Sequence, residues 1–491
     1  MNCRFIKVLT KSLIILCWLF PQAVLSQAPD TLWMRLIGGP NVDAAYSAVQ
    51  TSDGGHVIVG YTYAHPDSNS ELYVVRTDSY GVVDWEKIYG GSGDNWANSV
   101  DETSDGGYII AGGTTSSGGE DSDIYLLKID TAGRIIWEST IGGEFDEDAL
   151  SVCQTSDGGY IMTGWTNSFG AGEDDVYIVK TDSEGDTLWT KTFGYIFCDK
   201  AMSIIETTDG CYAAIGGTGY WGYYPTNAYL IKLDADGDSL WTRTYGGSWS
   251  DAGGAIIEAS DGGYIFLGWT LSFNVEGHDF YLVKVDSSGE QEFYRTYGGN
   301  EMDVGRSISL TSDGGYLLTG YTYSFGGWMD IYVIRTDSLG DTLWTDVIGG
   351  AGYDQGCFGY QCYDGGYIVG GSTQSFNARE CDILLAKYAS DQTAIDRDIE
   401  FIAANEYSLY QNYPNPFNET TTISFSINTN RHVSLKVYDL LGREAASLFD
   451  EDLPAGLYKT SVNASALASG IYIYSLQIDD YRESKMMTLL K

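Results

Sequence analysis

A six-residue motif recurs through most of this chain at a nearly constant interval. It first occurs as TSDGGH at residues 51–56, and its aspartate stands at Asp53, Asp105, Asp157, Asp209, Asp261, Asp313 and Asp364. Five of the six intervals are 52 residues and the last is 51. A period that regular indicates a repeat architecture. Each copy also places Asp-Gly between two alternating apolar runs, which is the strongest short-range signal for a β-hairpin.

The aligned copies contain four strand-like runs each. In the third copy these runs span residues 150–155, 160–164, 176–181 and 187–192. Tight turns join the first run to the second and the third to the fourth. The second turn carries a glycine where a type I turn with a G1 bulge needs a left-handed residue, at Gly81, Gly133, Gly185, Gly237, Gly289 and Gly340. Seven four-stranded units that cannot bury their faces alone predict an all-β fold, a seven-bladed β-propeller over residues 27–389.

The two ends of the array predict how the ring closes. Residues 31–37 carry Trp33 and match the fourth run of later copies, which carries Trp85, Trp137, Trp189, Trp241, Phe293 and Trp344. The last unit ends near Tyr388 and has no such run. The N-terminal strand is therefore expected to complete the seventh blade and remove an exposed edge. A solenoid is the alternative, and it would leave the Trp33 run unpaired.

The repeat also resembles known propeller families. YIVKTDSEGDTLWTKTFG at residues 177–194 resembles the tryptophan-docking repeat of quinoprotein-like propellers, with one residue fewer between Asp182 and Gly185. The whole unit is more similar to the SDGGY-type propeller repeats of secreted bacterial proteins. The resemblance covers about residues 30–390 and implies the fold, not an activity. No residue of the quinone pocket has a counterpart, so no cofactor is implied.

The first 26 residues have the pattern of a secretory signal peptide. Basic residues precede an apolar run at residues 12–20, and a small-residue exit ends at Ser26. The apolar run is too short to span a membrane. The formal net charge of −40 leaves no basic surface for nucleic acid or for an anionic membrane. We expect an exported protein with no transmembrane segment once the signal is removed.

The C-terminal segment is compositionally distinct from the repeats. Residues 390–405 form a polar linker, and alternating runs over 406–491 predict a small β-sandwich. This segment closely resembles the type A C-terminal sorting domain of the type IX secretion system, through LKVYDLLG, GIYIYSL, a basic end and the motif Asn412, Tyr413, Pro414, Asn415, Pro416 and Phe417. The resemblance implies passage through the periplasm, handling by the type IX machinery, and release or anchoring at the outer cell surface.

Six cysteines remain after the signal, and they do not follow the repeat: Cys153, Cys198, Cys211, Cys357, Cys362 and Cys381. A disulfide framework essential to the fold would recur with it. Cys198 and Cys211 are expected at opposite ends of one strand, too far apart to bond. Cys357 and Cys381 are expected at the same end and are the better-placed pair.

An acidic position lies ten residues before the motif aspartate, at Asp43, Asn95, Glu147, Asp199, Asp251, Asp303 and Asp354. If the strand ahead of the motif is innermost, these residues ring one mouth of the channel, where they could bind a cation. The interpretation we favour is that each caps the backbone of its crossing loop or pairs with a neighbouring residue. No metal site is assigned, and calcium stays open.

Aromatic residues in the long loop between the second and third strands are candidates for ligand binding. The position twelve residues after the motif aspartate is aromatic in five copies, at Phe169, Trp221, Phe273, Phe325 and Phe376, and the loops add Tyr220, Tyr223, Tyr224 and Trp328. Aromatic rings suit stacking on sugars. A phenylalanine at a repeating offset also suits packing beneath its loop, so the non-repeating Trp221, Tyr223, Tyr224 and Trp328 are the better candidates.

No constellation of residues predicts catalysis. The four histidines are isolated, no His/Cys spacing suits zinc, and no phosphate loop precedes a helix. Paired carboxylates stay open because the chain has 67 acidic residues. The sequence predicts a non-enzymatic binding or adhesion module, with a glycan or protein as ligand. The alternatives are a structural, calcium-stabilised matrix protein and a carbohydrate-active enzyme.

Overall fold

The computed structural model describes most of the chain between residues 28 and 489, and all statements below concern these residues: 28–63, 69–116, 121–219, 226–273, 275–391, 407–409, 412, 417, 420–427, 431–439, 443–453, 456–463, 470–479 and 481–489. The signal peptide and most of the predicted linker lie outside them. The described secondary structure is all β. No helix in these ranges is long and apolar enough to cross a membrane.

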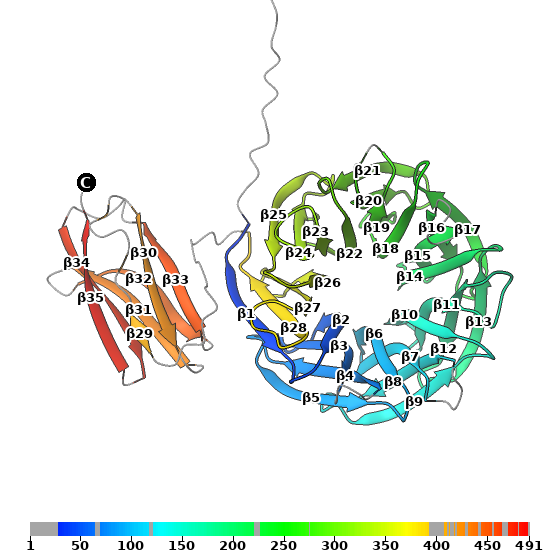
Figure 1. Ribbon diagram of the computed structural model, residues 1–491, viewed down its shortest axis with the longest axis horizontal. Helices are drawn as coiled ribbons and strands as arrows, with labels where there is room; N and C mark the ends of the chain where they lie inside the picture. The colour runs from blue at the N-terminus through cyan, green and yellow to red at the C-terminus, as the bar shows by residue number, and fades with distance from the viewer. Residues whose placement is uncertain are drawn as a thin grey trace, which may run out of the picture.

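Residues 31–388 form seven four-stranded sheets, here called blades, arranged around a central axis (Figure 1). The first blade contains β2 (Asp43–Gln50), β3 (His56–Tyr63), β4 (Ser70–Thr77) and β5 (Val83–Tyr89). The second contains β6 (Asn95–Glu102), β7 (Tyr108–Thr114), β8 (Asp123–Ile129) and β9 (Ile135–Ile141). The third contains β10 (Glu147–Gln154), β11 (Tyr160–Thr166), β12 (Asp175–Thr181) and β13 (Thr187–Phe193).

The remaining blades repeat this order from the axis outward. The fourth contains β14 (Cys198–Glu206), β15 (Tyr212–Gly219), β16 (Asn227–Leu233) and β17 (Ser239–Tyr245). The fifth contains β18 (Asp251–Glu258), β19 (Tyr264–Thr270), β20 (Asp279–Val285) and β21 (Gln291–Tyr297). The sixth contains β22 (Asp303–Leu310), β23 (Tyr316–Thr322), β24 (Asp330–Thr336) and β25 (Thr342–Ile348). Each innermost strand begins about three residues earlier than the sequence predicted.

The seventh blade joins the two ends of the ring. It contains β26 (Asp354–Gln361), β27 (Tyr367–Thr373), β28 (Asp382–Tyr388) and the N-terminal strand β1 (Thr31–Ile37). Strand β1 pairs antiparallel with β28, from Thr31 opposite Tyr388 to Ile37 opposite Ile383. The predicted closure by the N-terminal strand is therefore present, and β28 has no free edge.

Neighbouring blades pack through the tryptophan of the outermost strand. A Cβ atom at Gly185 would approach within 2.6 Å of the Trp137 ring from the preceding blade. Gly185 has a φ of +85°, so this turn requires glycine both for its conformation and for the close contact. The same arrangement joins Trp33 to Gly81, across the point where the ring closes.

The motif aspartate forms an ion pair as well as a turn. Asp105 Oδ1 accepts hydrogen bonds from the Gly107 amide at 2.9 Å and from Thr103 Oγ1 at 2.5 Å. Lys128, which is buried on β8, donates to the same oxygen at 2.8 Å. All seven blades repeat this pair, through Arg76–Asp53, Lys128–Asp105, Lys180–Asp157, Lys232–Asp209, Lys284–Asp261, Arg335–Asp313 and Lys387–Asp364. The sequence predicted only the turn.

The C-terminal residues form two further sheets with a shared core. One contains β29 (Ser408–Leu409), β30 (Thr420–Ile427) and β33 (Gly456–Asn463). The other contains β31 (Arg431–Asp439), β32 (Glu444–Leu453), β34 (Gly470–Ile478) and β35 (Tyr481–Leu489). Buried side chains from both sheets form one hydrophobic cluster, which includes Phe425, Val437 and Tyr474. This is the predicted small sandwich.

All six cysteines of the described residues are free thiols. The expected bond between Cys357 and Cys381 is absent. Cys198 begins β14 opposite Gly219, whereas Cys211 lies beside the turn at the other end of the same hairpin. The separation predicted for that pair is therefore present.

Candidate functional site

The blade connections divide the ring into two faces. The motif turns and the glycine turns between the third and fourth strands lie at one end, here the turn face. The loops between the second and third strands, and the crossing loops to the next blade, lie at the other end. We call this end the long-loop face; its exposed part includes residues 142–146, 167–174, 194–197, 246–250, 323–329 and 349–353.

The acidic positions ten residues before the motif aspartate lie at the start of the innermost strands, as the first residue or, for Asp199, the second. Their side chains are buried and bind their own crossing loops. Glu147 Oε2 accepts the Gly143 amide at 2.6 Å, and Asp251 Oδ2 accepts the Gly247 amide at 2.7 Å. Equivalent bonds reach Asp43, Asp199, Asp303 and Asp354. This geometry is the capping arrangement that the sequence favoured.

A second acidic residue lies beside several of these caps. Asp279, at the start of β20, and Asp303, from the next blade, both approach Gly298; a Cβ there would lie 2.3 and 2.6 Å from their oxygens. Burial, and secondarily the charge of Asp303, raise the pKa of Asp279 to about 6. Oδ1 of Asp279 has no hydrogen-bond donor. Among the described residues, no group of three His, Cys, Asp or Glu side chains could hold a metal ion.

The phenylalanines predicted in the long loops all contact the protein. Phe169 and Phe325 are exposed, yet each lies against a strand tyrosine, Tyr177 at 5.7 Å and Tyr332 at 5.2 Å between ring centroids. Phe273 is partly buried and stacks on Tyr294 at 4.5 Å. In these three copies, the phenylalanine at the repeating position therefore packs against a tyrosine of its own blade.

The non-repeating aromatic candidates divide into one described residue and a group outside the structure. Trp328 is 59% exposed and makes an edge contact with Tyr353, with ring centroids 5.9 Å apart. The residues Tyr220, Trp221, Tyr223 and Tyr224 lie outside the described residues. Their role in binding stays a prediction.

The crossing loops carry further exposed apolar side chains that the sequence reasoning missed, namely Phe145, Tyr195, Ile196, Phe197, Trp249 and Tyr353. Trp249 is 66% exposed and Ile196 is 71% exposed. A signal was available twelve residues before the motif aspartate, where Phe145, Phe197 and Trp249 occupy three consecutive copies and polar residues or glycine occupy the others.

Part of this apolar surface lies on neighbouring loops. The Phe145 amide donates to Ser168 Oγ at 2.8 Å, which places Phe145 beside the loop that carries Phe169. On the other side of the same loop, a Cβ at Gly172 would lie 2.7 Å from the Tyr195 carbonyl and 2.4 Å from that of Phe197. The two crossing loops and the long loop between them are therefore neighbours. Together they carry a group of exposed apolar side chains, here called the apolar patch: Phe145, Phe169, Tyr195, Ile196 and Phe197.

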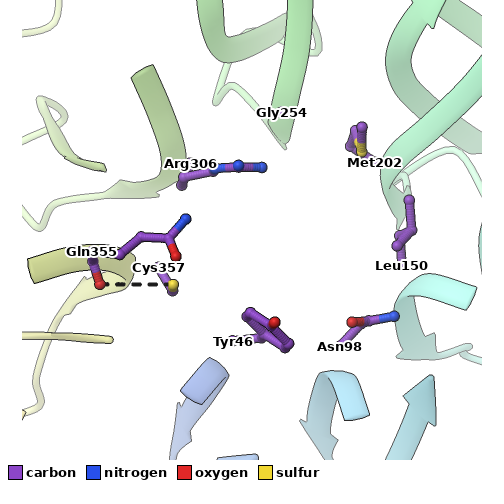
Figure 2. A pocket seen from close by; sticks show the side chains of 8 residues that line it. All are labelled: Tyr46, Asn98, Leu150, Met202, Gly254, Arg306, Gln355 and Cys357. Carbon is purple, nitrogen blue, oxygen red and sulfur yellow. Dashed lines mark hydrogen bonds between the residues drawn. The ribbon is translucent and has the colours of Figure 1, made fainter. Parts of the chain in front are cut away.

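The central channel contains a cavity of about 240 Å³ (Figure 2). One residue from each innermost strand lines it, seven residues before the motif aspartate, and Gln355 completes the lining: Tyr46, Asn98, Leu150, Met202, Gly254, Arg306, Cys357 and Gln355. These seven are also the residues at which strand pairing is irregular, as between Ala45 and Ser47. A β-bulge thus turns one side chain per blade toward the channel.

The channel residues do not repeat in chemistry. Blade packing requires similar residues in every copy, whereas this position holds a phenol, an amide, two apolar chains, a glycine, a guanidinium and a thiol. Burial raises the pKa of Cys357 to about 12, while the nearby Arg306 charge opposes that rise. Such a thiol is a poor nucleophile at neutral pH. Variation at a position where the fold repeats makes these residues candidates for a functional role.

A polar network borders the channel at the second and third blades. Trp96 Nε1 and Asn98 Nδ2 donate to Asp148 Oδ1 at 3.1 and 3.0 Å. Burial raises the pKa of Asp148 to about 7 against these hydrogen bonds and the charge of Lys200. Lys200 lies 3.8 Å from the centroid of the Trp165 ring. Both hydrogen bonds from Asn98 to Asp148 use Nδ2, so Oδ1 is the atom of that amide that faces away from Asp148.

Comparison with known proteins identifies the C-terminal sheets. Residues 411–489 match the family described as the secretion system C-terminal sorting domain. Asn412 and Phe417 of the sorting motif are buried there: the Asn412 amide donates to Tyr474 Oη at 2.8 Å, and the Phe417 amide to the Thr488 carbonyl at 3.0 Å. Residues 413–416 lie outside the described residues. The chain thus carries a domain that directs type IX secretion.

Similarity over the repeats is weaker. The regulatory protein FlaEY of Caulobacter vibrioides is 26% identical over 163 residues, which is 28% of this chain and 17% of that protein. Among solved structures, the β-propeller domain of the Trilobed protease from Pyrococcus furiosus is 12% identical with a TM-score of 0.41, over 70% of this chain and 94% of that one. Sqt1 from Chaetomium thermophilum is 10% identical with a TM-score of 0.40, over 70% and 83%. Scores this low say nothing about activity.

Proposed function

We propose that this protein is an exported β-propeller that binds an extracellular glycan or protein ligand on its long-loop face. The observation that carries the proposal is the set of exposed apolar side chains there, with the apolar patch on one side of the ring and Trp249 and Trp328 elsewhere on the same face. Contiguous exposed apolar patches are uncommon on soluble monomers and mark interaction sites.

The opposite face offers a contrast within the same molecule. There each blade repeats the same motif aspartate and its buried cation, and the exposed apolar side chains of the turns, Tyr80, Leu339 and Tyr363, lie in separate blades. Uniform chemistry on the turn face suits a scaffold, and varied aromatic chemistry on the long-loop face suits recognition. The sorting domain supports a destination at the cell surface or beyond it, where glycans and proteins of other cells are available.

The test is a binding screen of the full exported chain against arrayed glycans and surface proteins. We expect a saturable ligand whose affinity falls when Trp249 and Trp328 are each changed to alanine. Tyr363→Ala is the matched control, because Tyr363 is 74% exposed on the turn face. Affinity that both tryptophan variants leave unchanged would contradict the proposal. Release of shortened sugars from an arrayed polysaccharide would indicate the enzymatic alternative instead.

A further inference from the structure

The channel contains one positive charge. Arg306 projects from β22 into the cavity (Figure 2). Its guanidinium lies 5.8 Å from the centroid of the Tyr321 ring, and it forms no ion pair among the described residues. The buried cations of the third strands are each paired with a motif aspartate, whereas Arg306 is exposed to the channel. In a chain of net charge −40, its positive charge is therefore accessible to an anionic ligand that enters the channel.

We infer that the channel is a subsite for the carboxylate of an acidic sugar, with Arg306 as its anchor. This inference rests on the proposed function, because it names the kind of glycan that the long-loop face would hold. A planar guanidinium can give two parallel hydrogen bonds to a carboxylate, which a neutral sugar cannot accept in the same way. The long-range repulsion from the acidic surface is screened beyond about 8 Å at physiological ionic strength, so it does not cancel a direct contact.

The remaining lining suits the rest of a sugar ring. Gln355 and Asn98 each offer an amide, and Tyr46 offers a phenol whose ring centroid lies 5.8 Å from that of Tyr61. Leu150 and Met202 give the apolar surface against which the carbon face of a sugar packs. A lining that combines apolar surface with a few convergent polar groups is found in small-molecule sites. The lack of a side chain at Gly254, beside Arg306 in blade order, leaves room at that side.

The experiment measures binding of glucuronate, glucose and acetate to the full exported chain by ligand-detected nuclear magnetic resonance. Glucuronate should bind more tightly than either of the others. Arg306→Gln should weaken glucuronate about tenfold, the effect of one lost charge-assisted hydrogen bond, and leave glucose unchanged. Met202→Trp, which fills the cavity without removing the charge, should weaken it too. Arg243→Gln is the matched control, because Arg243 is exposed on the outermost strand β17.

Each remaining outcome decides against the inference or separates it from the proposed function. Glucuronate binding that is absent, equal to that of glucose, or unaffected by Arg306→Gln overturns it. If acetate binds as tightly as glucuronate, the channel does not recognise the sugar ring and is a simple anion site, which overturns the inference. A third outcome is that glucuronate binds in a way that depends on Arg306, while no oligosaccharide or protein binds in a way that depends on Trp249 and Trp328. This outcome would support the channel subsite and contradict the proposed binding site on the long-loop face.

Discussion

Lys128 Nζ lies 2.8 Å from Asp105 Oδ1, and this one contact joins the third strand of a blade to the turn between its first two strands. The lysine side chain is 3% exposed and the aspartate is 58% exposed. Burial alone would raise the pKa of Asp105, but hydrogen bonds from Lys128, Thr103 and the Gly107 amide lower it to about 2. The pair therefore has an asymmetric environment, since only the lysine depends on its partner for solvation.

This asymmetry predicts that removing the aspartate lowers the free energy of unfolding more than removing the lysine does. Asp105→Ala leaves a buried ammonium without its counter-ion and should lower the free energy of unfolding by about 2 kcal/mol. Lys128→Met leaves an aspartate that water can solvate and should cost about 1 kcal/mol or less. Denaturant titrations followed by tryptophan fluorescence measure both. Lys191→Met, which removes an exposed pair with Asp238, serves as the control. Equal costs for the two halves would contradict the argument.

The acidic pair of Asp279 and Asp303 predicts a stability that depends on pH. The pKa of Asp279 is about 6 in the folded chain, above the value near 4 of an unfolded aspartate. Because the folded chain holds the proton of Asp279 more tightly than the unfolded chain, the protonated side chain is fully accommodated below pH 4. As pH rises through 6 the side chain ionises in the folded chain, and the free energy of unfolding falls. The Asn227 side chain already occupies the equivalent position beside Asp251. Asp279→Asn should therefore raise the free energy of unfolding at pH 8 by about 1–3 kcal/mol.

Two measurements test this pH dependence. Melting temperatures of the wild-type chain and of Asp279→Asn should converge at pH 4 and separate at pH 8. Asp236→Asn, in an exposed turn, removes the same charge and should show no such separation. A constant difference at all pH values would reject the assignment to Asp279.

The sequence allowed prediction of the features that repeat. The 52-residue period, the turn glycines such as Gly185 and the extra Trp33 run were enough to derive the blades and their closure, because each depends on local backbone chemistry or on counting strands. The sorting motif was equally predictable, since Asn412 and Phe417 stand within a family-specific order of runs. In contrast, the ion pair of Lys128 with Asp105 joins residues 23 apart, and no local pattern shows that a strand lysine reaches a turn.

The candidate site was predicted only in part, for a related reason. The channel side chains, such as Arg306 and Tyr46, face inward because of β-bulges. A bulge adds one residue and changes which positions point to the axis, so the alternation of the sequence does not show that these side chains line the channel. Trp249 was not predicted, because the aromatic candidates were taken from the loop between the second and third strands and Trp249 lies in a crossing loop between blades.

Hydrogen bonds between blades on the turn face predict where the ring can be stabilised. Gln154 Oε1 accepts the Ser104 amide of the preceding blade at 2.7 Å, and Gln361 Oε1 accepts that of Ser312 at 2.7 Å. Leu310 occupies the equivalent position in the sixth blade and is exposed. Leu310→Gln should restore a bond to the Ser260 amide and raise the free energy of unfolding by about 0.5–1 kcal/mol. Gln154→Leu, the reverse change, should lower it by a similar amount. If Gln154→Leu lowers the free energy of unfolding but Leu310→Gln does not raise it, the sixth blade cannot form the bond.

Closure by β1 predicts that the N-terminal residues control the stability of the whole ring. A chain that begins at residue 39 lacks β1 and exposes the edge of β28, whose backbone groups would then be free to pair with other chains. We expect it to unfold at lower denaturant concentration and to aggregate in proportion to its concentration, as light scattering would show. Trp33→Ala keeps the strand but removes a buried ring, and should cost about 3–5 kcal/mol. Trp85→Ala removes an equivalent ring that is partly exposed, and should cost less. Cooperative unfolding of the shortened chain at the wild-type midpoint would show that the ring is stable without its seventh outer strand.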